Sequence, residues 1–584
     1  MMRSVVCVGK PSGRWLCALQ KLDALTWMSA DEERWSAELL ALDSASVLIS
    51  ADVSPEFRNR ILTGRKPASN VVVVVLIDEC SREGNSCLET IAHLPVVSAA
   101  LSLDETAGGR VFMSGDVMAS EVAAPIFAQM SLAPVYCGAR AEDARLIALI
   151  QHAICALGRL VVIEAAGMGV RAGLPVDLAA SVIGRSSGRS RQTEIFFDGL
   201  IHPDRDEACE SGTVATMLGH LVDVAMALGL PLPLTSAALA LLSLETVDDV
   251  DDGRPGADPF ARYERLVGLR RDLVVTSNAD EPAGVDSPPS PVIGYVGLGA
   301  MGSALAMQAL RVARELHVYD PDPAKVEHLT RQGARAAADV ASLAAVCDLI
   351  FLCVPSAKEV EQILFGTDGM YAALHRGKIV IDQTTCSPAE TVRLGERLAV
   401  AGVAMVDAPV TGGPDGARNG ALITMCGGQD AAFSRVRPIL EAMGGEVVYF
   451  GAPGSGQAIK LVKNSLGAGN RLIIYEMLSV AAASGLRIDT LRAALSTGAS
   501  ASGALDRILH SIMTGSPTAD ASLRTVVKDQ QLIGRMGRAT GSPIPLLNTA
   551  RTVLEAGSRM LGPAAQIDDL GRLYGIESFQ GIEK

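Results

Sequence analysis

Two lysines and an asparagine follow a glycine-rich turn in the stretch GSGQAIKLVKN, and their types and spacing suit proton transfer. If the chain is helical from Gly456 onward, residues four apart share one face, so Lys460 and Asn464 project together while Lys463 points roughly 60° away. A lysine can take or give a hydroxyl proton if burial or a neighbouring cation lowers its pKa from about 10. We therefore expect Lys460 to be an acid/base group that Asn464 orients. Whether Lys463 takes part or is only a solvated lysine stays open.

A glycine fingerprint lies earlier in the same half of the chain, in PVIGYVGLGAMGSALAMQAL. Three glycines have the G-x-G-x-x-G spacing, directly after a predicted strand and at the start of a predicted helix. The first allows a tight turn, the second lets the backbone approach a pyrophosphate, and the third lets helix and strand pack closely. The predicted dinucleotide-binding residues are Gly297, Leu298, Gly299, Ala300, Met301 and Gly302.

An acidic residue, Asp320, ends the next predicted strand, ELHVYD. An acid about twenty residues after the fingerprint can bond the ribose 2′-hydroxyl of adenosine and repel a 2′-phosphate. Asp320 therefore favours NAD over NADP, although NADP is not excluded. In the alternative interpretation Asp320 only caps the helix that begins in PDPAK, and both roles could hold together.

A turn formed by Thr411, Gly412 and Gly413 offers backbone N–H groups and a hydroxyl to a substrate. Successive N–H groups of this kind can cradle a carboxylate. Taken alone, the three residues are also compatible with an ordinary loop. We expect them to bind the substrate because they directly follow a predicted strand.

Five stretches in order resemble the β-hydroxyacid dehydrogenases, a family that includes 3-hydroxyisobutyrate dehydrogenase and tartronate semialdehyde reductase and is related to 6-phosphogluconate dehydrogenase. The resemblance spans residues 291–584. It rests on the glycine fingerprint, DQTTCSP (382–388), DAPVTGGPDGARNGALITMCGG (407–428), GSGQAIKLVKN and VVKDQQL (526–532). It implies catalytic roles for Lys460 and Asn464, and a carboxylate-binding role for the Thr-Gly-Gly turn, in which the family usually has serine first.

The same resemblance implies four further cofactor contacts, at Val354, Pro355, Thr385 and Lys528. Each of the first three has a structural alternative: Val354 and Pro355 could simply form a strand-end turn, and Thr385 could be a helix cap. Lys528 would reach the cofactor from the helical domain.

The chain also carries one pattern twice. CGGQDAAFSRVRPILEAMGGEVVYFG is followed by RLIIYEMLSVAAASGLRID, and the earlier MSGDVMASEVAAPIFAQMSLAPVYCG is followed by RLVVIEAAGMGVRAGLPVD. Residues correspond at one constant offset, which predicts a tandem duplication. The pairs are Arg159 with Arg471, Glu164 with Glu476, Gly173 with Gly485, and Pro231 with Pro543.

The predicted fold class is α/β plus all-α, with two tandem units. Each unit has a Rossmann-like parallel-sheet domain followed by a helical domain. In the sheet domain β-branched runs alternate with helical patterns, and five such runs predict strands in the second unit: VIGYVGLG, LHVYD, DLIFLCVP, KIVIDQTT and AMVDAPV. The stretch TSNADEPAGVDSPPSP has the composition of a linker. The expected boundaries are 1–140 for a degenerate Rossmann-like domain, 141–275 for its helical domain, 276–290 for the linker, 291–453 for the NAD-binding domain and 454–584 for the C-terminal helical domain.

The first unit has lost the residues that the chemistry needs. Its start, VVCVGKPSGRWLCAL, keeps only Gly9 and Gly13 of the fingerprint, Ser29 stands in place of Asp320, and LSLDETAGG brings acids to the carboxylate turn. Depending on a one-residue gap, Lys460 corresponds to Ile147 or Ala148 and Asn464 to Gln151 or His152, whereas Lys528 corresponds to Thr216. The first unit is therefore predicted to keep the fold without activity, as one half of an intramolecular pseudo-dimer that could itself form a homodimer.

Composition narrows the class of partner. At 584 residues, with a net charge of -14 and a pI near 5.2, the chain does not suit a nucleic acid or an anionic membrane. The eleven cysteines have neither zinc nor redox spacing, so we expect no metal site. Their scattered spacing also predicts a reducing, cytoplasmic location. The apolar stretch 221–244 contains Asp223, Pro231 and Pro233, which favour two helices joined by a turn over a membrane span.

These features predict an NAD(P)-dependent oxidoreductase. Its substrate would be a small β-hydroxy acid or the semialdehyde or keto partner, such as 3-hydroxyisobutyrate, glycerate, tartronate semialdehyde or a threonate-like acid. One alternative is an NAD-binding regulatory or scaffold protein with vestigial activity. Another is an imine-reducing relative, but Lys460 argues against it because that group typically replaces the lysine.

Overall fold

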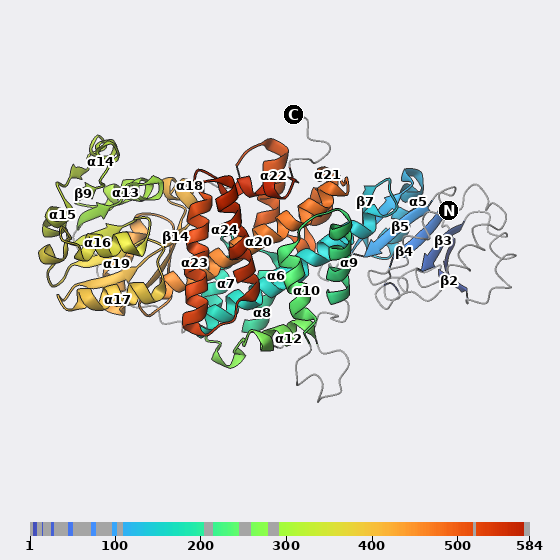
Figure 1. The fold of residues 1–584 in the computed structure, drawn as a ribbon, viewed down its shortest axis with the longest axis horizontal. Helices are drawn as coiled ribbons and strands as arrows, with labels where there is room; N and C mark the ends of the chain where they lie inside the picture. Colours follow the sequence, from blue (N-terminus) through green and yellow to red (C-terminus); the bar gives the residue numbers. More distant parts are fainter. Residues whose placement is uncertain are drawn as a thin grey trace.

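The computed structural model describes residues 109–203, 214–244, 258–277, 291–517 and 521–576, together with Trp15 and five strands between Ser4 and Leu101. The molecule is elongated, with one sheet at each end and a body of helices between them (Figure 1). We call residues 1–277 the first half and residues 291–584 the second half.

The sheet of the first half has the strand order β2-β1-β3-β4-β5-β6-β7. Helix α5 (Val117–Gln129) packs on it. Its strands are β1 (Ser4–Val8), β2 (Leu25–Met28), β3 (Ala45–Ser50), β4 (Val72–Ile77), β5 (Val96–Leu101), β6 (Arg110–Gly115) and β7 (Ala133–Gly138).

The sheet of the second half has the order β10-β9-β8-β11-β12-β13-β15-β14, with β16 also paired to β15. Its central strands are buried along their whole length, as expected for strands covered on both faces. The strands are β8 (Val292–Val296), β9 (Glu315–Tyr319), β10 (Arg335–Ala336), β11 (Leu349–Leu352), β12 (Ile379–Asp382), β13 (Ala404–Asp407), β14 (Val410–Thr411), β15 (Ile423–Gly428) and β16 (Glu446–Tyr449).

Helices cover both faces of this sheet, and each face has its own apolar core. Helices α13 and α19 contribute to one core and helices α15, α16 and α17 to the other. The helices of this region are α13 (Ala300–Val312), α14 (Pro323–Thr330), α15 (Val340–Val346), α16 (Ala357–Phe365), α17 (Pro388–Ala399), α18 (Gly413–Arg418) and α19 (Asp430–Ala442).

Neither sheet is parallel throughout, contrary to the prediction. Strand β13 runs antiparallel to β15, and β5 runs antiparallel to β6. A parallel neighbour needs a long crossover, usually a helix that packs across the sheet. The connection from β13 to β15 instead passes through β14, which itself pairs antiparallel with β15, and only a short segment joins β5 to β6. The five stretches predicted as strands of the second half are otherwise confirmed as β8, β9, β11, β12 and β13.

The helical body is built on two 29-residue helices, α6 (Asp143–Arg171) and α20 (Ser455–Ala483), which pack against each other near its centre. The first half adds α7 (Val176–Gly184), α8 (Arg191–Ile201), α9 (Val214–Ala227), α10 (Pro233–Leu242) and α12 (Pro259–Leu266). The second half adds α21 (Ile488–Leu495), α22 (Gly503–Thr514), α23 (Leu523–Thr540), α24 (Pro545–Leu561) and α25 (Leu570–Leu573). One apolar core runs through the helices of both halves.

The two halves repeat the same order of elements. Strand β1 matches β8 in its place in the sheet, and the order continues to β7 and β16, with the antiparallel pair at the same position. The helix pairs α6 and α20, α7 and α21, α8 and α22, and α10 and α24 begin at the constant sequence offset seen in the repeat.

The apolar stretch 221–244 forms most of α9 and all of α10, as predicted, with a turn between them. Among the described residues, one helix is long and apolar enough to cross a membrane, and that helix is α6. Nearly all of its apolar window is buried inside the protein, which is typical of a core helix. Of the predicted linker, Ser277 donates from its backbone N–H to Asp177 of α7 at 2.8 Å. Residues 278–290 lie outside the described part of the chain.

Candidate active site

The glycine loop between β8 and α13 has the geometry of a dinucleotide cradle. Gly297 has a φ of 93°, and a Cβ there would lie 2.3 Å from the carbonyl oxygen of Cys353 at the end of β11. A Cβ on Gly302 would lie 1.9 Å from the carbonyl oxygen of Gly297, whereas one on Gly299 would meet nothing within 4 Å. The first and third glycines therefore allow close packing, and the second leaves open space at the N-terminus of α13, where a pyrophosphate fits.

Asp320 ties the end of β9 to this loop. Its carboxylate accepts from the backbone N–H of Leu298 at 2.7 Å and of Asp322 at 2.9 Å, and Lys325 Nζ lies 3.4 Å away. Burial opposes ionisation, but these hydrogen bonds and Lys325 outweigh it and hold the pKa of Asp320 below its ordinary value. The alternative that Asp320 caps the next helix is wrong, because Asp322 is the N-cap of α14.

The start of α20 is fixed by two buried side chains. Asp407, at the end of β13, accepts from the backbone N–H groups of Gly454 at 2.8 Å and Gln457 at 2.9 Å. The amide of Gln457 accepts from Cys386 N at 3.0 Å and donates to Thr384 O at 2.6 Å. Burial raises the pKa of Asp407 to about 6. Asp407 and Gln457 thus hold α20 against the strand ends of the sheet.

Lys460 lies one turn into α20 and is partly buried. Its Nζ donates to the carbonyl oxygen of Val410 at 2.7 Å. Val410 directly precedes Thr411, so the structure brings the predicted acid/base residue to the predicted carboxylate turn. Burial, with a smaller effect of Lys528, lowers the pKa of Lys460 below its ordinary value, although Asp529 opposes the shift. A lowered pKa is what an acid/base lysine requires.

The Thr-Gly-Gly turn is strained in a way that glycine tolerates. Gly412 has a φ of 129° and Gly413 a φ of 70°, and the side chain of Thr411 is buried. Residues with a Cβ rarely adopt these backbone angles, whereas glycine does so readily. The turn therefore presents backbone groups at the start of α18 in a conformation that depends on both glycines.

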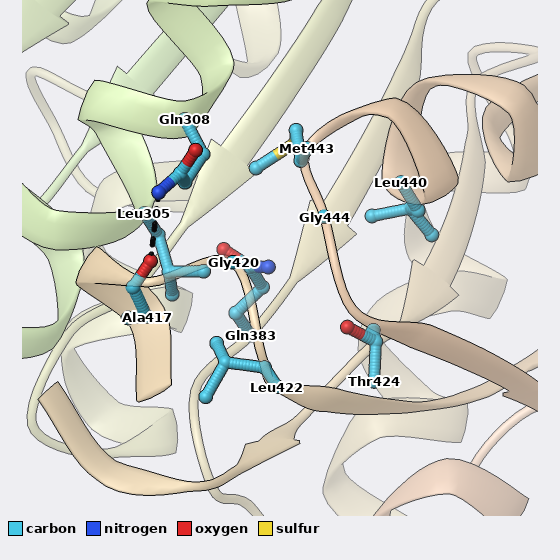
Figure 2. A pocket seen from close by; sticks show the side chains of 10 residues that line it. All are labelled: Leu305, Gln308, Gln383, Ala417, Gly420, Leu422, Thr424, Leu440, Met443 and Gly444. Atoms are coloured by element: carbon cyan, nitrogen blue, oxygen red, sulfur yellow. Dashed lines mark hydrogen bonds between the residues drawn. The ribbon is translucent and has the colours of Figure 1, made fainter. Parts of the chain in front are cut away.

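Figure 2 shows a pocket lined by Leu305, Gln308, Gln383, Ala417, Gly420, Leu422, Thr424, Leu440, Met443 and Gly444. Gln308, on α13, points its amide toward the end of α18 and donates to the carbonyl oxygens of Ala417 and Arg418, both at 2.9 Å. This link couples the helix that follows the glycine loop to the helix that follows the Thr-Gly-Gly turn. The lysines of α20 do not line the pocket, which we assign a structural role.

Asn464 and Lys463 form a chain of hydrogen bonds with Asp529 of α23. Lys463 Nζ donates to Asn464 Oδ1 at 3.1 Å, and Asn464 Nδ2 donates to Asp529 Oδ2 at 2.8 Å. Lys463 is only 5% exposed, so the alternative of a solvated lysine is wrong. Gly188 of the first half lies against the backbone of α20 at Lys463, and the sequence of one helix does not reveal which segments pack around it.

Lys528 brings the predicted cofactor contacts together from the opposite side. Its Nζ donates to the carbonyl oxygens of Pro355 and Thr385, both at 3.2 Å. Val354 and Pro355 do form the turn after β11, and Val354 N donates to Thr384 Oγ1 at 3.1 Å. The helix-cap alternative for Thr385 is wrong, since Ser387 caps α17.

Sequence reasoning missed two residues of this arrangement. Asp529 was given no role, although it directly follows Lys528 in the quoted stretch VVKDQQL. Asp407 opens the quoted stretch DAPVTGG, and its role as a cap for α20 was not predicted. An acid at the end of a buried strand was the available signal for Asp407, whereas nothing local indicated the partner of Asp529.

The first half has different side chains at the corresponding places. The matching ends of α6 and α20 remove the one-residue gap, so Lys460 corresponds to Ala148, Lys463 to Gln151 and Asn464 to His152. All three residues on α6 are buried. Thr216 lies exposed on α9. Gly9, Gly13, Ser29 and the residues of LSLDETAGG between Leu101 and Gly109 lie outside the described part of the chain.

Two family models match the second half. Residues 292–451 match the NAD binding domain of 6-phosphogluconate dehydrogenase, and residues 454–574 match the NAD-binding domain of NADP-dependent 3-hydroxyisobutyrate dehydrogenase. A 2-(hydroxymethyl)glutarate dehydrogenase of Eubacterium barkeri is 31% identical over 269 residues, which are 46% of this chain and 89% of the relative. An L-threonate dehydrogenase of Cupriavidus necator is 31% identical over 292 residues, 50% of this chain and 97% of the relative. Among solved structures, a 3-hydroxyisobutyrate dehydrogenase from Salmonella typhimurium aligns with a TM-score of 0.44 at 28% identity, covering 48% of this chain and 99% of the other.

Proposed function

The chain belongs to the β-hydroxyacid dehydrogenase family, and we propose that its second half moves a hydride between NAD(P) and the CH–OH carbon of a small β-hydroxy acid. The observation that carries this proposal is the hydrogen bond from Lys460 to Val410, which holds an amine with a lowered pKa beside the Thr-Gly-Gly turn. A hydride transfer of this kind needs a proton acceptor within reach of the substrate hydroxyl.

Each residue of the site has one task in this proposal. The N–H groups and hydroxyl of Thr411, Gly412 and Gly413 hold the substrate carboxylate. Neutral Lys460 takes the hydroxyl proton during oxidation and returns it during reduction, and Asn464 orients the substrate with support from Asp529. The nicotinamide, when bound, supplies the hydride acceptor.

The glycine loop with Gly297, Gly299 and Gly302 holds the dinucleotide, and Leu298, Ala300 and Met301 complete it. Val354, Pro355, Thr385 and Lys528 form the wall nearer the helical domain. Asp320 favours NAD, because its carboxylate stays ionised and repels a 2′-phosphate. Lys325 beside it weakens that repulsion and leaves NADP as a second cofactor.

A panel of hydroxy acids tests the proposal. Wild-type protein and Lys460→Ala are assayed by NADH and NADPH absorbance with 3-hydroxyisobutyrate, glycerate, threonate and 4-hydroxybutyrate. Loss of an acid/base group lowers kcat/KM by roughly 100- to 10,000-fold. Arg559→Ala, at an exposed position on α24, is the control and retains wild-type activity. A loss below tenfold in Lys460→Ala contradicts the assignment, and NADH binding without turnover favours the regulatory alternative.

We also propose that the first half is a non-catalytic pseudo-subunit that supplies the dimer interface within one chain. Glu164 of α6 accepts from the backbone N–H groups of Leu546 and Leu547, and Glu476 of α20 accepts from those of Leu234 and Thr235. The glutamate of each half binds the same two positions in the other half, as the two sides of an isologous interface do.

A second set of contacts follows the same exchange. Ser190 pairs with its counterpart Ser502 as an antiparallel bridge. On either side of it, Arg191 N donates to Ala501 O at 2.9 Å and Gly503 N donates to Arg189 O at 3.1 Å. A contact between a residue and its own counterpart marks an approximate two-fold axis.

The second half expressed alone, as residues 286–584, tests this arrangement. Without the first half, an apolar face of α20 is exposed, so this fragment aggregates or pairs with a second copy of itself. Size-exclusion chromatography with light scattering measures the outcome. A monomeric fragment with full activity would remove the interface role from the first half.

A further inference from the structure

Lys463 is a buried lysine whose side-chain amine has few hydrogen-bond partners. Its Nζ donates to the neutral Oδ1 of Asn464 at 3.1 Å, and a protonated Nζ would have two further hydrogens to donate. No carboxylate in the described part of the chain lies within ion-pair distance of it. Burial without an opposite charge favours the neutral amine, and an anion bound beside Lys463 would favour the ammonium form and accept its remaining hydrogens.

The surroundings of Lys463 hold more basic side chains than acidic ones. Lys460 lies one turn away on the same helix, and Arg507 of α22 is close enough to act on it, whereas Asp529 is the one acid that acts in the opposite direction. Burial, then Lys460, holds the pKa of Lys463 well below its ordinary value. Asp529 already accepts from Asn464 and lies 3.2 Å from Lys528. One substrate carboxylate on the Thr-Gly-Gly turn would leave Lys463 without an acidic partner.

The first half packs against α20 at the position of Lys463. Gly188, in the turn before α8, lies against the backbone of α20, and a Cβ there would be 3.2 Å from the carbonyl oxygen of Lys463 and 3.2 Å from Cβ of Leu466. Asn470 Nδ2 donates to the carbonyl oxygen of the same glycine at 3.4 Å. This segment covers the backbone of α20 beside Lys463.

We propose that Lys463 forms a second anion subsite beside Lys460, so that the preferred substrate is a β-hydroxy acid with a second carboxylate. The proposal rests on the proposed dehydrogenase function of the same site. The first carboxylate lies on the Thr-Gly-Gly turn, the hydroxyl faces Lys460, and the second carboxylate takes the free donors of Lys463. The subsite selects the substrate and takes no part in proton transfer.

Substrates that differ in one group test this inference. 3-Hydroxyisobutyrate has a methyl group where 2-(hydroxymethyl)succinate and 2-(hydroxymethyl)glutarate have carboxylate arms of two lengths. With wild-type protein, kcat/KM for the better diacid exceeds that for 3-hydroxyisobutyrate by at least tenfold. Lys463→Met keeps the length and removes the charge, so it lowers kcat/KM for the diacid by roughly 10- to 100-fold, mainly through KM. It changes the value for 3-hydroxyisobutyrate by less than threefold.

Two controls separate binding of the anion from a structural effect. Lys463→Arg restores part of the preference for the diacid because it restores the charge, whereas Arg559→Met leaves both substrates unaffected. Equal losses on both substrates in Lys463→Met, or a wild-type protein that does not prefer the diacid, overturn the inference.

A binding measurement keeps the test independent of turnover. Isothermal titration of the NAD-loaded protein compares glutarate with butyrate, which lacks the second carboxylate. Wild-type protein binds glutarate roughly tenfold or more tightly than butyrate, and Lys463→Met loses that difference. If no hydroxy acid is turned over, the dehydrogenase proposal fails while this comparison still decides the subsite. Equal affinity of the wild-type protein for the two ligands overturns it.

Discussion

Helices α6 and α20 have the same length and the same place in their halves, but they carry different polar residues. Helix α20 has Lys460, Lys463 and Asn464 where α6 has Ala148, Gln151 and His152. Farther along, both helices keep a buried glutamate that binds two backbone N–H groups of the other half.

The comparison separates two tasks that one helix performs. In the proposed function, the glutamates near the end of each helix hold the halves together, and polar residues in the first turns carry the chemistry in the second half alone. Because the two sets of residues do not overlap, substitutions in the first turns of α6 can remove a site while the interface persists. The retained glutamates fit this account, since each contributes to the fold of the opposite half.

The largest predicted effect is on stability. Glu476→Ala leaves the buried N–H groups of Leu234 and Thr235 without an acceptor, and Glu164→Ala does the same to Leu546 and Leu547. Each change should lower the free energy of unfolding by about 3 kcal/mol, measured by urea denaturation. Near-equal losses support the two-fold relation, whereas a loss in only one variant breaks it.

These glutamates also give stability a defined pH dependence. Burial raises the pKa of Glu164 and of Glu476 from 4.5 to about 7. The folded protein therefore binds more protons than the unfolded chain, so the free energy of unfolding falls as pH rises from about 4.5 to 7. Glu476→Ala should show a shallower slope than wild-type protein. Glu396→Ala, at an exposed position on α17, should keep the wild-type slope and stability.

A smaller predicted effect concerns enzyme activity and distinguishes α20 from α6. Asn464→Ala removes the amide that orients the substrate and that Asp529 holds at 2.8 Å, and it should lower kcat/KM by roughly 10- to 100-fold, in line with the loss of a charge-assisted hydrogen bond. His152→Ala, at the corresponding place on α6, should change kcat/KM by less than threefold. Activity losses of similar size in steady-state assays would show that both halves contribute to catalysis.

Much of this architecture could be predicted from the sequence because its signals are local. The alternation of apolar runs predicted strands β8, β9, β11, β12 and β13, and the glycine spacing predicted the loop before α13. The distance along one helix correctly placed Lys460 and Asn464 on α20. The constant offset also anticipated that the two long helices would have matching ends.

The features that could not be predicted depend on contacts between distant segments. The antiparallel pair of β13 and β15 follows from a connection through β14, which the apolar pattern did not reveal. Burial of Lys463 depends on the segments that pack around α20. The cap on α14 is Asp322, because the carboxylate of Asp320 accepts from the N–H of Leu298 in the glycine loop. In each case, a partner far away in the sequence decided between two locally acceptable interpretations.

The number of NADH molecules bound by each chain tests most directly the claim that the second half alone carries the active site. Isothermal titration of the full-length protein should give one site per chain. Gly302→Val should abolish that site, because a Cβ at Gly302 would lie 1.9 Å from the carbonyl oxygen of Gly297. Two sites per chain, or binding that persists in Gly302→Val, would contradict the account.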